Sequence, residues 1–362
     1  MGNNTSITEH KRHYYRELLC IGVPIIIGQL GTIILGFADT LMIGHHSTEE
    51  LAAAGLVNNI ITFILVSYMG FSYGLTPIIG KLYGMEKTDE IGQKVKNSFF
   101  ANMVVGVIFS LALIILYFNL HRIGQPEELL ALIRPYFIVN LVSVLFVGVF
   151  NTLKQFLDGI GNTKVAMWVM IMGNIVNIFG NWVLIYGVGP CPEMGLLGAG
   201  ISTLASRVLM AVAMVGIIAV TKEYREYRNN IIASRINGAD FREMNRLGWP
   251  VALQLALESG AFTLSCVMVG WLGTIPLAAH QVMITISQLF YLVLSGMAAA
   301  LAIRVSHFVG QNDFAAVRRN AYDGWRLNLL FSLCMGIPVL LLRHQIGGWF
   351  NDNVEVQQYV AL

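Results

Sequence analysis

The sequence predicts an all-α polytopic membrane protein built from two copies of one helical unit, and three observations predict this fold. The 362 residues are 56% hydrophobic and 12% charged, whereas soluble domains are about 25% charged. Nine apolar runs approach or exceed the roughly 20 residues that a helix needs to cross about 30 Å of hydrocarbon. The third observation is an internal repeat with one constant offset.

The repeat places residues 22–55 on residues 248–281 without a gap, at an offset of 226 residues. The register also holds outside this stretch and across expected loops, which chance matches would not do. We therefore predict a duplicated unit. The identical pairs include Gly22 and Gly248, Pro24 and Pro250, Met42 and Met268, Gly44 and Gly270, Gly70 and Gly296, Gly84 and Gly310, and Asn102 and Asn328.

The predicted helices are separated by connections whose charge alternates. Lys and Arg gather before the first run and after the second, fourth, sixth and eighth, while the intervening connections hold only Arg122, Arg134 and Arg343. The positive-inside rule then places the N-terminus in the cytoplasm of a multi-pass plasma (inner) membrane protein. The predicted helices lie at about 18–43, 52–79, 97–118, 132–156, 165–186, 196–220, 247–271, 278–303 and 325–342.

The segments before and between these runs have the composition expected of a terminus, a turn and a linker. The first run follows about 17 polar residues and is too long for the core of a signal peptide. The glycine-rich segment 155–164 joins the fourth and fifth runs, and we interpret it as a tight cytoplasmic turn because it lacks a Walker pattern. The polar residues 221–244 after the sixth run are the natural linker between the two copies.

Six helices separate the two copies, and this even number requires both copies to insert in the same orientation. The halves are then related by a pseudo-twofold axis along the membrane normal. We expect a first lobe of helices 1–6 at 1–220, a cytoplasmic linker at 221–246 and a partial second lobe of helices 7–9 at 247–362. At the repeat offset Leu362 corresponds to Tyr136, so the second lobe is expected to be incomplete by about three helices.

Composition and motifs exclude several function classes. A net charge of +2 gives no electrostatic footprint for nucleic acid. Four single, scattered cysteines indicate neither a disulfide framework nor a metal knuckle. No HExxH, GxSxG or Ser/His/Asp constellation is present, so we expect neither an enzyme nor a cofactor. His280 and Gln281, at the outer start of the eighth run, are interpreted as a packing or gating pair rather than as metal ligands.

Glu258 is the first candidate functional residue, because it lies at the middle of the seventh run. A charge at that depth costs about 2.5–3.5 kcal/mol on insertion scales, so it needs a partner, a proton or an ion. Gln254 and Ser265, four residues before it and seven after it, lie on the same helix face. The alternative to cation or proton coupling is a protonated acid bonded to a neighbouring helix.

Asp39 is the second candidate, near the outer end of the first run. Its helix face also carries Gln29 and Thr32, and Thr32 and Asp39 are the repeat equivalents of Glu258 and Ser265. Equivalent faces of the two copies therefore both carry polar groups, which favours a functional role. A carboxylate so near the membrane surface can also simply reach interfacial water.

The fifth and sixth runs add further polar candidates. Asn174, Asn177 and Asn181 share one helix face and could form an oxygen-rich cavity with Asp39. Amides in hydrocarbon also serve as packing contacts between helices, so a purely structural role stays open. Arg207 is the one central cation of the apolar runs. It either neutralises an acid structurally or tunes a carboxylate.

These residues together resemble the multidrug and toxic compound extrusion (MATE) family, in the branch that keeps a glutamate in its seventh helix. The resemblance covers essentially the whole chain. Its motifs are specific in combination and weak singly. They are Pro24, Gln29, Asp39, Gly44 and LAA at 51–53, the QFLDGIGNTK turn at 155–164, the asparagines before Tyr186-Gly187, Pro192-Glu193-Met194-Gly195, Glu258 and LAAHQ at 277–281.

The resemblance implies two six-helix lobes that form a V and exchange an amphipathic organic cation or drug for Na⁺ or H⁺. Asp39, Asn177 and Asn181 match the family's N-lobe cation or proton site, and Glu258 matches the C-lobe site. Any Na⁺ is expected at Glu258 or Asp39, and no other metal is expected. In the family the C-lobe site also uses an acid and a tyrosine from a tenth helix, which lies beyond the nine runs of this sequence. A monomer in the lipid bilayer is expected.

Three rival hypotheses remain at this point. A lipid-linked glycan flippase of the same superfamily would need a more cationic cavity than Arg207 alone supplies. A membrane-embedded enzyme would need a catalytic constellation. The third rival is a truncated product that does not transport.

Overall fold

The computed structural model is all-helical and describes residues 2–123, 126–350 and 354–361. Within these ranges it has nine helical spans long and apolar enough to cross a membrane, one for each apolar run of the sequence. The predicted fold class is thus confirmed. The helices are α1 (Gly2–His46), α2 (Thr48–Tyr73), α3 (Leu75–Gly84), α4 (Thr88–Phe118), α5 (Glu127–Gly159), α6 (Thr163–Ile185), α7 (Gly195–Val220), α8 (Arg225–Ala233), α9 (Gly238–Gly270), α10 (Thr274–Gly310), α11 (Phe314–Phe350) and α12 (Val354–Ala361), with 3₁₀ turns at Leu120–Ile123 and Lys222–Tyr224.

The helices extend beyond the apolar runs because polar first and last turns continue the helix into the aqueous boundary. The α9 helix begins at Gly238, inside the stretch predicted as a linker, where the Asn237 side chain accepts a hydrogen bond from the Ala239 amide at 3.0 Å. That stretch also forms α8, which sequence reasoning missed because its nine residues have no sustained apolar face. The second span consists of α2 and α3 with Gly74 between them.

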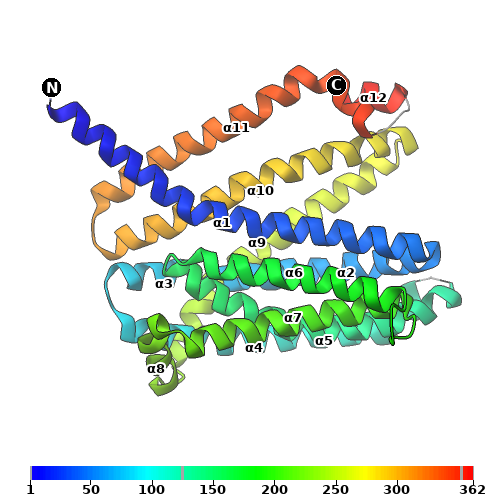
Figure 1. Ribbon diagram of the computed structural model, residues 1–362, viewed down its shortest axis with the longest axis horizontal. Coiled ribbons are helices and arrows are strands. Elements are labelled where there is room, and N and C mark those ends of the chain that lie inside the picture. Colours follow the sequence, from blue (N-terminus) through cyan, green and yellow to red (C-terminus); the bar gives the residue numbers. More distant parts are fainter. Residues whose placement is uncertain (1, 124–125, 351–353, 362) are drawn as a thin grey trace.

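The connections that are rich in Lys and Arg lie together at one end of the bundle, which we call the basic end. It holds the starts of α1, α4, α6 and α11 and lies on the left in Figure 1. The turn expected at 155–164 is shorter than predicted: α5 continues through Gly159 and α6 begins at Thr163, so only residues 160–162 connect the two helices. Gly161 has a φ of 87°, which a glycine adopts without strain.

The two copies contact each other through two interfaces related by the repeat. A β-carbon at Gly22 of α1 would lie 2.7 Å from the Met297 sulfur of α10. The repeat equivalents of these residues meet in the same way, since a β-carbon at Gly248 of α9 would lie 2.7 Å from the Phe71 ring of α2. Each of these glycines lets two helices approach closely. The repeated contact confirms that the copies are related as a parallel repeat.

The closest approach of the two copies lies at the basic end. A β-carbon at Gly84 of α3 would lie 2.0 Å from the His307 carbonyl oxygen, and one at Gly310 would lie 2.1 Å from the Lys81 carbonyl oxygen. Gly84 and Gly310 are repeat equivalents, as are Lys81 and His307. The backbones of α3 and α10 therefore touch beside the pseudo-twofold axis.

The copies separate toward the opposite end. The buried residues of α9 are Asp240, Met244, Gly248 and Ala252, all in its first half. Beyond Ala252 most of its large apolar side chains are exposed, among them Leu257, Phe262 and Leu264. Figure 1 shows the same divergence, with α9 leaving α2 as it runs to the right. The molecule is therefore closed at the basic end and open at the other.

Candidate functional site

Asp39 of α1 faces α6 and is held there by the predicted asparagines. The Asn181 side-chain nitrogen donates a hydrogen bond to Asp39 Oδ1 at 2.5 Å. The Asn177 amide also reaches this oxygen. With its nitrogen toward Asp39 it donates at 3.0 Å, and its oxygen then accepts from the Thr203 hydroxyl at 3.2 Å. Hydrogen bonds to a charged acceptor are the strong ones, so this arrangement stabilises a carboxylate away from water.

The α7 helix completes this Asp39 site with residues that sequence reasoning missed. Besides Thr203, the Ser202 hydroxyl donates to the Asn177 carbonyl oxygen at 2.8 Å, and Ser206 is buried beside Asn177. The signal was present, because Ser202, Thr203 and Ser206 recur at helical spacing in an apolar run, as the asparagines do. Asn177 and Asn181 are fully buried.

Arg207 lies one residue beyond this group and donates to the Ser143 hydroxyl of α5. It interacts electrostatically with Asp39 and with Tyr136 of α5. The Tyr136 hydroxyl in turn donates to Asn58 of α2 at 3.0 Å. Side chains from α1, α2, α5, α6 and α7 thus form one polar region inside the first copy.

The remaining predicted residues of the first copy lie apart from this group. Asn174 packs on Gly31, where a β-carbon would be 2.7 Å from its side-chain nitrogen, and this nitrogen has no hydrogen-bond partner among the described residues. Thr32 is exposed and bonds to the Gly28 carbonyl oxygen of its own helix at 3.3 Å. Gln29 accepts from Ser295 of α10 at 3.4 Å and so contacts the other copy.

Glu258 of α9 lies in a second, separate polar site. It is half-buried and interacts electrostatically with the nearby Tyr291 of α10, a residue that sequence reasoning missed. Gln254 is exposed, and the Ser265 hydroxyl bonds to the Ala261 carbonyl oxygen of its own helix at 2.9 Å. Of the predicted stripe on α9, only Glu258 therefore makes a described polar contact with another helix.

His280 and Gln281 lie in the first two turns of α10, away from both carboxylates. His280 borders a hollow of about 450 Å³ with Met283 and Tyr359, and its Nε2 has no partner among the described residues. Gln281 is exposed. In the described part of the chain no three His, Cys, Asp or Glu side chains form a metal cluster.

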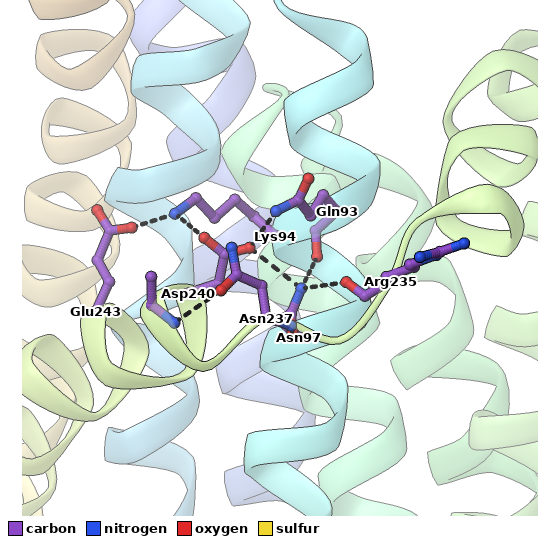
Figure 2. A network of polar contacts seen from close by, with 8 residues as sticks. Gln93, Lys94, Asn97, Arg235, Asn237, Asp240 and Glu243 are labelled. Carbon is purple, nitrogen blue, oxygen red and sulfur yellow. Dashed lines mark hydrogen bonds and ion pairs between the residues drawn. The ribbon is translucent and has the colours of Figure 1, made fainter.

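A third polar group joins the copies at the basic end (Figure 2). Lys94 of α4 donates to Asp240 Oδ1 of α9 at 2.7 Å and to Glu243. Gln93 and Asn97 donate to the other oxygen of Asp240, at 2.6 and 3.2 Å. Asp240 is nearly buried, so the three donors compensate its loss of water. We call these five residues the basic-end network.

The residues N-terminal to Asp240 are also fixed to α4. The Asn97 side-chain oxygen accepts from the Asn237 amide at 2.7 Å, and its nitrogen donates to the Arg235 carbonyl oxygen at 3.3 Å. Lys96 donates to the Ser234 carbonyl oxygen at 2.6 Å. The start of α9 is therefore tied to the first copy, as Figure 2 shows.

Chemically, the Asp39 site combines a carboxylate with the side-chain oxygens of Asn177, Asn181 and Thr203, and oxygen ligands of these kinds are the ones that hard cations prefer. The Asn181 side-chain oxygen is buried and has no donor among the described residues, so it is free to accept from a water or bind a cation. The second site offers Glu258 and a phenol.

Known proteins resemble the chain in sequence and in fold. The multidrug resistance protein NorM of Photobacterium profundum is 27% identical over 350 residues, which cover 95% of this chain and 76% of that protein. The probable multidrug resistance protein NorM of Photorhabdus laumondii subsp. laumondii is 30% identical over 339 residues, which cover 93% and 74%.

Among solved structures, the eukaryotic MATE transporter AtDTX14 superposes with a TM-score of 0.83 at 18% identity, covering 96% of this chain and 77% of that one. An outward-facing structure of a multidrug resistance MATE family transporter also reaches a TM-score of 0.83, at 20% identity and with 95% and 76% coverage. At these identities the superpositions show the fold alone.

A family model described as MatE matches residues 24–183 and again residues 250–361. The two matches begin at Pro24 and Pro250, which are the repeat equivalents found in the sequence. Together they span most of the chain and reproduce its duplication, so the protein belongs to the MatE family of efflux transporters.

Proposed function

We propose that the protein is a cation-coupled antiporter that exports amphipathic organic cations or drugs in exchange for Na⁺ or H⁺. Membership of the MatE family supports transport rather than enzyme catalysis. Both curated relatives are named as multidrug resistance proteins, which supports a drug-like substrate. The Lys and Arg content of the basic end supports a cytoplasmic N-terminus in the plasma (inner) membrane.

The observation that carries the proposal is the Asp39 site. A carboxylate within a membrane span is expensive unless it serves a pathway for ions or protons. Asn177, Asn181 and Thr203 surround Asp39 with donors and oxygen acceptors, and the Asn181 oxygen is left without a donor among the described residues. This set suits a site that binds a cation or a proton and releases it again.

Glu258 is the proposed second coupling group, in the other copy. Its contact with Tyr291 supplies one hydroxyl, and its half-buried position allows access from the open side between the copies. A cation or proton held at Asp39 or Glu258 would change the free energy difference between the open and closed arrangements only if it binds one arrangement more tightly.

Alternating access is the proposed mechanism of transport. The copies meet closely at the basic end and separate at the other, and the exposed faces of α1 and α9 carry apolar side chains such as Phe37 and Phe262. An apolar wall with few fixed polar groups accepts many amphipathic cations. Rocking one copy against the other about the bilayer midplane would expose this wall to each side in turn.

The test is transport by vesicles that contain the purified chain. A Na⁺ or H⁺ gradient should drive tetraphenylphosphonium across the membrane, and Asp39→Asn should reduce the driven component about 10- to 100-fold by removing one charged ligand. The exposed Asp89→Asn is the matched control and should transport like the parent. Driven transport that Asp39→Asn leaves unchanged would overturn the role assigned to Asp39.

A further inference from the structure

A groove between α1 and α6 lies at the basic end, where the spans enter the membrane boundary. It is shallow and open to its surroundings, and it measures about 580 Å³. Leu19, Val23 and Pro24 form its wall on α1, and Lys164 borders it from the start of α6. The two helices are fixed to each other beside the groove, because the Thr163 hydroxyl donates to the Ile21 carbonyl oxygen at 3.0 Å.

Two cations stand at the rim of this groove. Arg16 and Lys164 both line it, and both are exposed. The groove surface itself is apolar, so the two side chains contribute their aliphatic stems and leave their charged ends at the edge. Among the residues that the structure describes, no carboxylate lines the groove.

The carboxylates near this rim are engaged elsewhere. Glu17, the neighbour of Arg16, pairs with Arg304 of α10 at 2.5 Å. Asp323 of α11 lies near the Tyr15 hydroxyl and pairs with Arg326 at 3.8 Å. Among the side chains that the structure describes, the charge at the mouth of the groove is therefore positive, although the floor of the groove is apolar.

We propose that this groove binds one anionic phospholipid, with the phosphate held by Arg16 and Lys164 and the glycerol and upper acyl chain lying on Leu19, Val23 and Pro24. Basic pockets between transmembrane helices on the cytoplasmic side bind anionic headgroups because apolar contact and charge attraction act together. A zwitterionic lipid satisfies the apolar wall and leaves both cations without a matching net charge. The proposal is independent of the transported substrate, because the groove contains neither Asp39 nor Glu258.

A native cysteine, Cys20, can be used to measure whether the groove is occupied. Cys20 lines the groove and is a free, exposed cysteine, while Cys334 of α11 is free and exposed but does not line it. A lipid seated in the groove shields Cys20 from a maleimide and leaves Cys334 unaffected. Mass spectrometry of the labelled protein reads both rates in one sample.

The experiment titrates dioleoylphosphatidylglycerol into micelles of dioleoylphosphatidylcholine and detergent that contain the purified chain. We expect the anionic lipid to slow labelling of Cys20 relative to Cys334. The midpoint is the concentration of anionic lipid that gives half of this effect, and the zwitterionic lipid should not reproduce the effect. In the double variant Arg16→Gln and Lys164→Gln the midpoint should rise about 25-fold, from about fivefold for each lost charge.

Two controls separate a binding site from general surface charge. The pair Arg318→Gln and Arg319→Gln removes the same charge from exposed positions of α11 and should leave the midpoint unchanged. Val23→Trp fills the groove and keeps both cations, so native mass spectrometry should find one anionic lipid fewer bound than to the parent. Equal protection of Cys20 by both lipids, or an equal effect of the two charge pairs, would overturn the proposal.

Discussion

At the scale of single residues, the structure separates side chains that the sequence alone could not rank. Asn174, Asn177 and Asn181 share one helix face, yet Asn177 and Asn181 contact Asp39 while Asn174 packs on Gly31. Spacing predicts which residues share a face but not which neighbouring helix each one meets. Tyr291 and Thr203 were missed for the same reason, because their importance depends on which side chains of the preceding helix they face.

Asn181→Ala should therefore impair coupled transport more than Asn174→Ala. The first change removes a donor to Asp39 and leaves a membrane carboxylate with one partner fewer, a loss of about 1.5–3 kcal/mol for a bond to a charged group. The second removes an amide whose nitrogen has no partner among the described residues. Initial rates of gradient-driven efflux measure both. A larger loss for Asn174→Ala would contradict the assigned geometry.

Glu258→Gln tests the second copy at the same scale. The amide keeps the shape of the side chain and its contact with Tyr291 while it removes the charge. We expect substrate binding without a gradient to persist and gradient-driven efflux to fall at least tenfold. Undiminished driven efflux would remove Glu258 from the coupling mechanism.

At the scale of helices, the sequence predicted the existence and order of the nine spans that the described residues form, because length and apolarity decide them. It did not predict the break at Gly74 or the helix α8 inside the expected linker. Both depend on contacts with other elements: Gly74 packs on Gly248, and Asn230 of α8 lies against Gly92 of α4. Hydropathy carries no information about such contacts.

Lys94→Gln should weaken closure at the basic end. Lys94 holds the nearly buried Asp240, and removing one partner of a buried pair is more disruptive than removing an exposed one. We expect a maleimide to label a cysteine placed at the buried Ser306 of α10 several times faster in the Lys94→Gln variant than in the parent. The matched change Lys87→Gln, in an exposed pair with Glu90 at the start of the same helix, should have no effect. Equal labelling in the two variants would show that the basic-end network does not hold the copies closed.

Gly84→Ala addresses the close approach of α3 and α10. The new β-carbon would lie 2.0 Å from the His307 carbonyl oxygen, so the two backbones must move apart. A cysteine at Ser306 should again be labelled faster than in the parent, which would show that the basic end has opened. A separate transport assay should show a loss of efflux. Gly216→Ala, at a position on α7 with no neighbour within 4 Å, is the control. Normal closure in Gly84→Ala would show that this contact does not gate the pathway.

At the scale of the whole molecule, the repeat explains the architecture. The glycine contacts of α1 with α10 recur as those of α9 with α2, and the axis between them passes the pair Gly84 and Gly310. The sequence could reveal this duplication because both copies keep glycine where helices touch. It could not reveal that one end is closed, because closure is a property of how the copies meet.

The measurement that tests the central claim most directly is the ion movement that accompanies the substrate. Vesicles containing the chain are given an outward gradient of tetraphenylphosphonium and no ion gradient, and the fluxes of Na⁺ and H⁺ are recorded together. The antiport account predicts that one of the two cations moves inward while the substrate moves outward, and that Asp39→Asn abolishes this linked flux. Substrate movement with no opposite cation flux would contradict it.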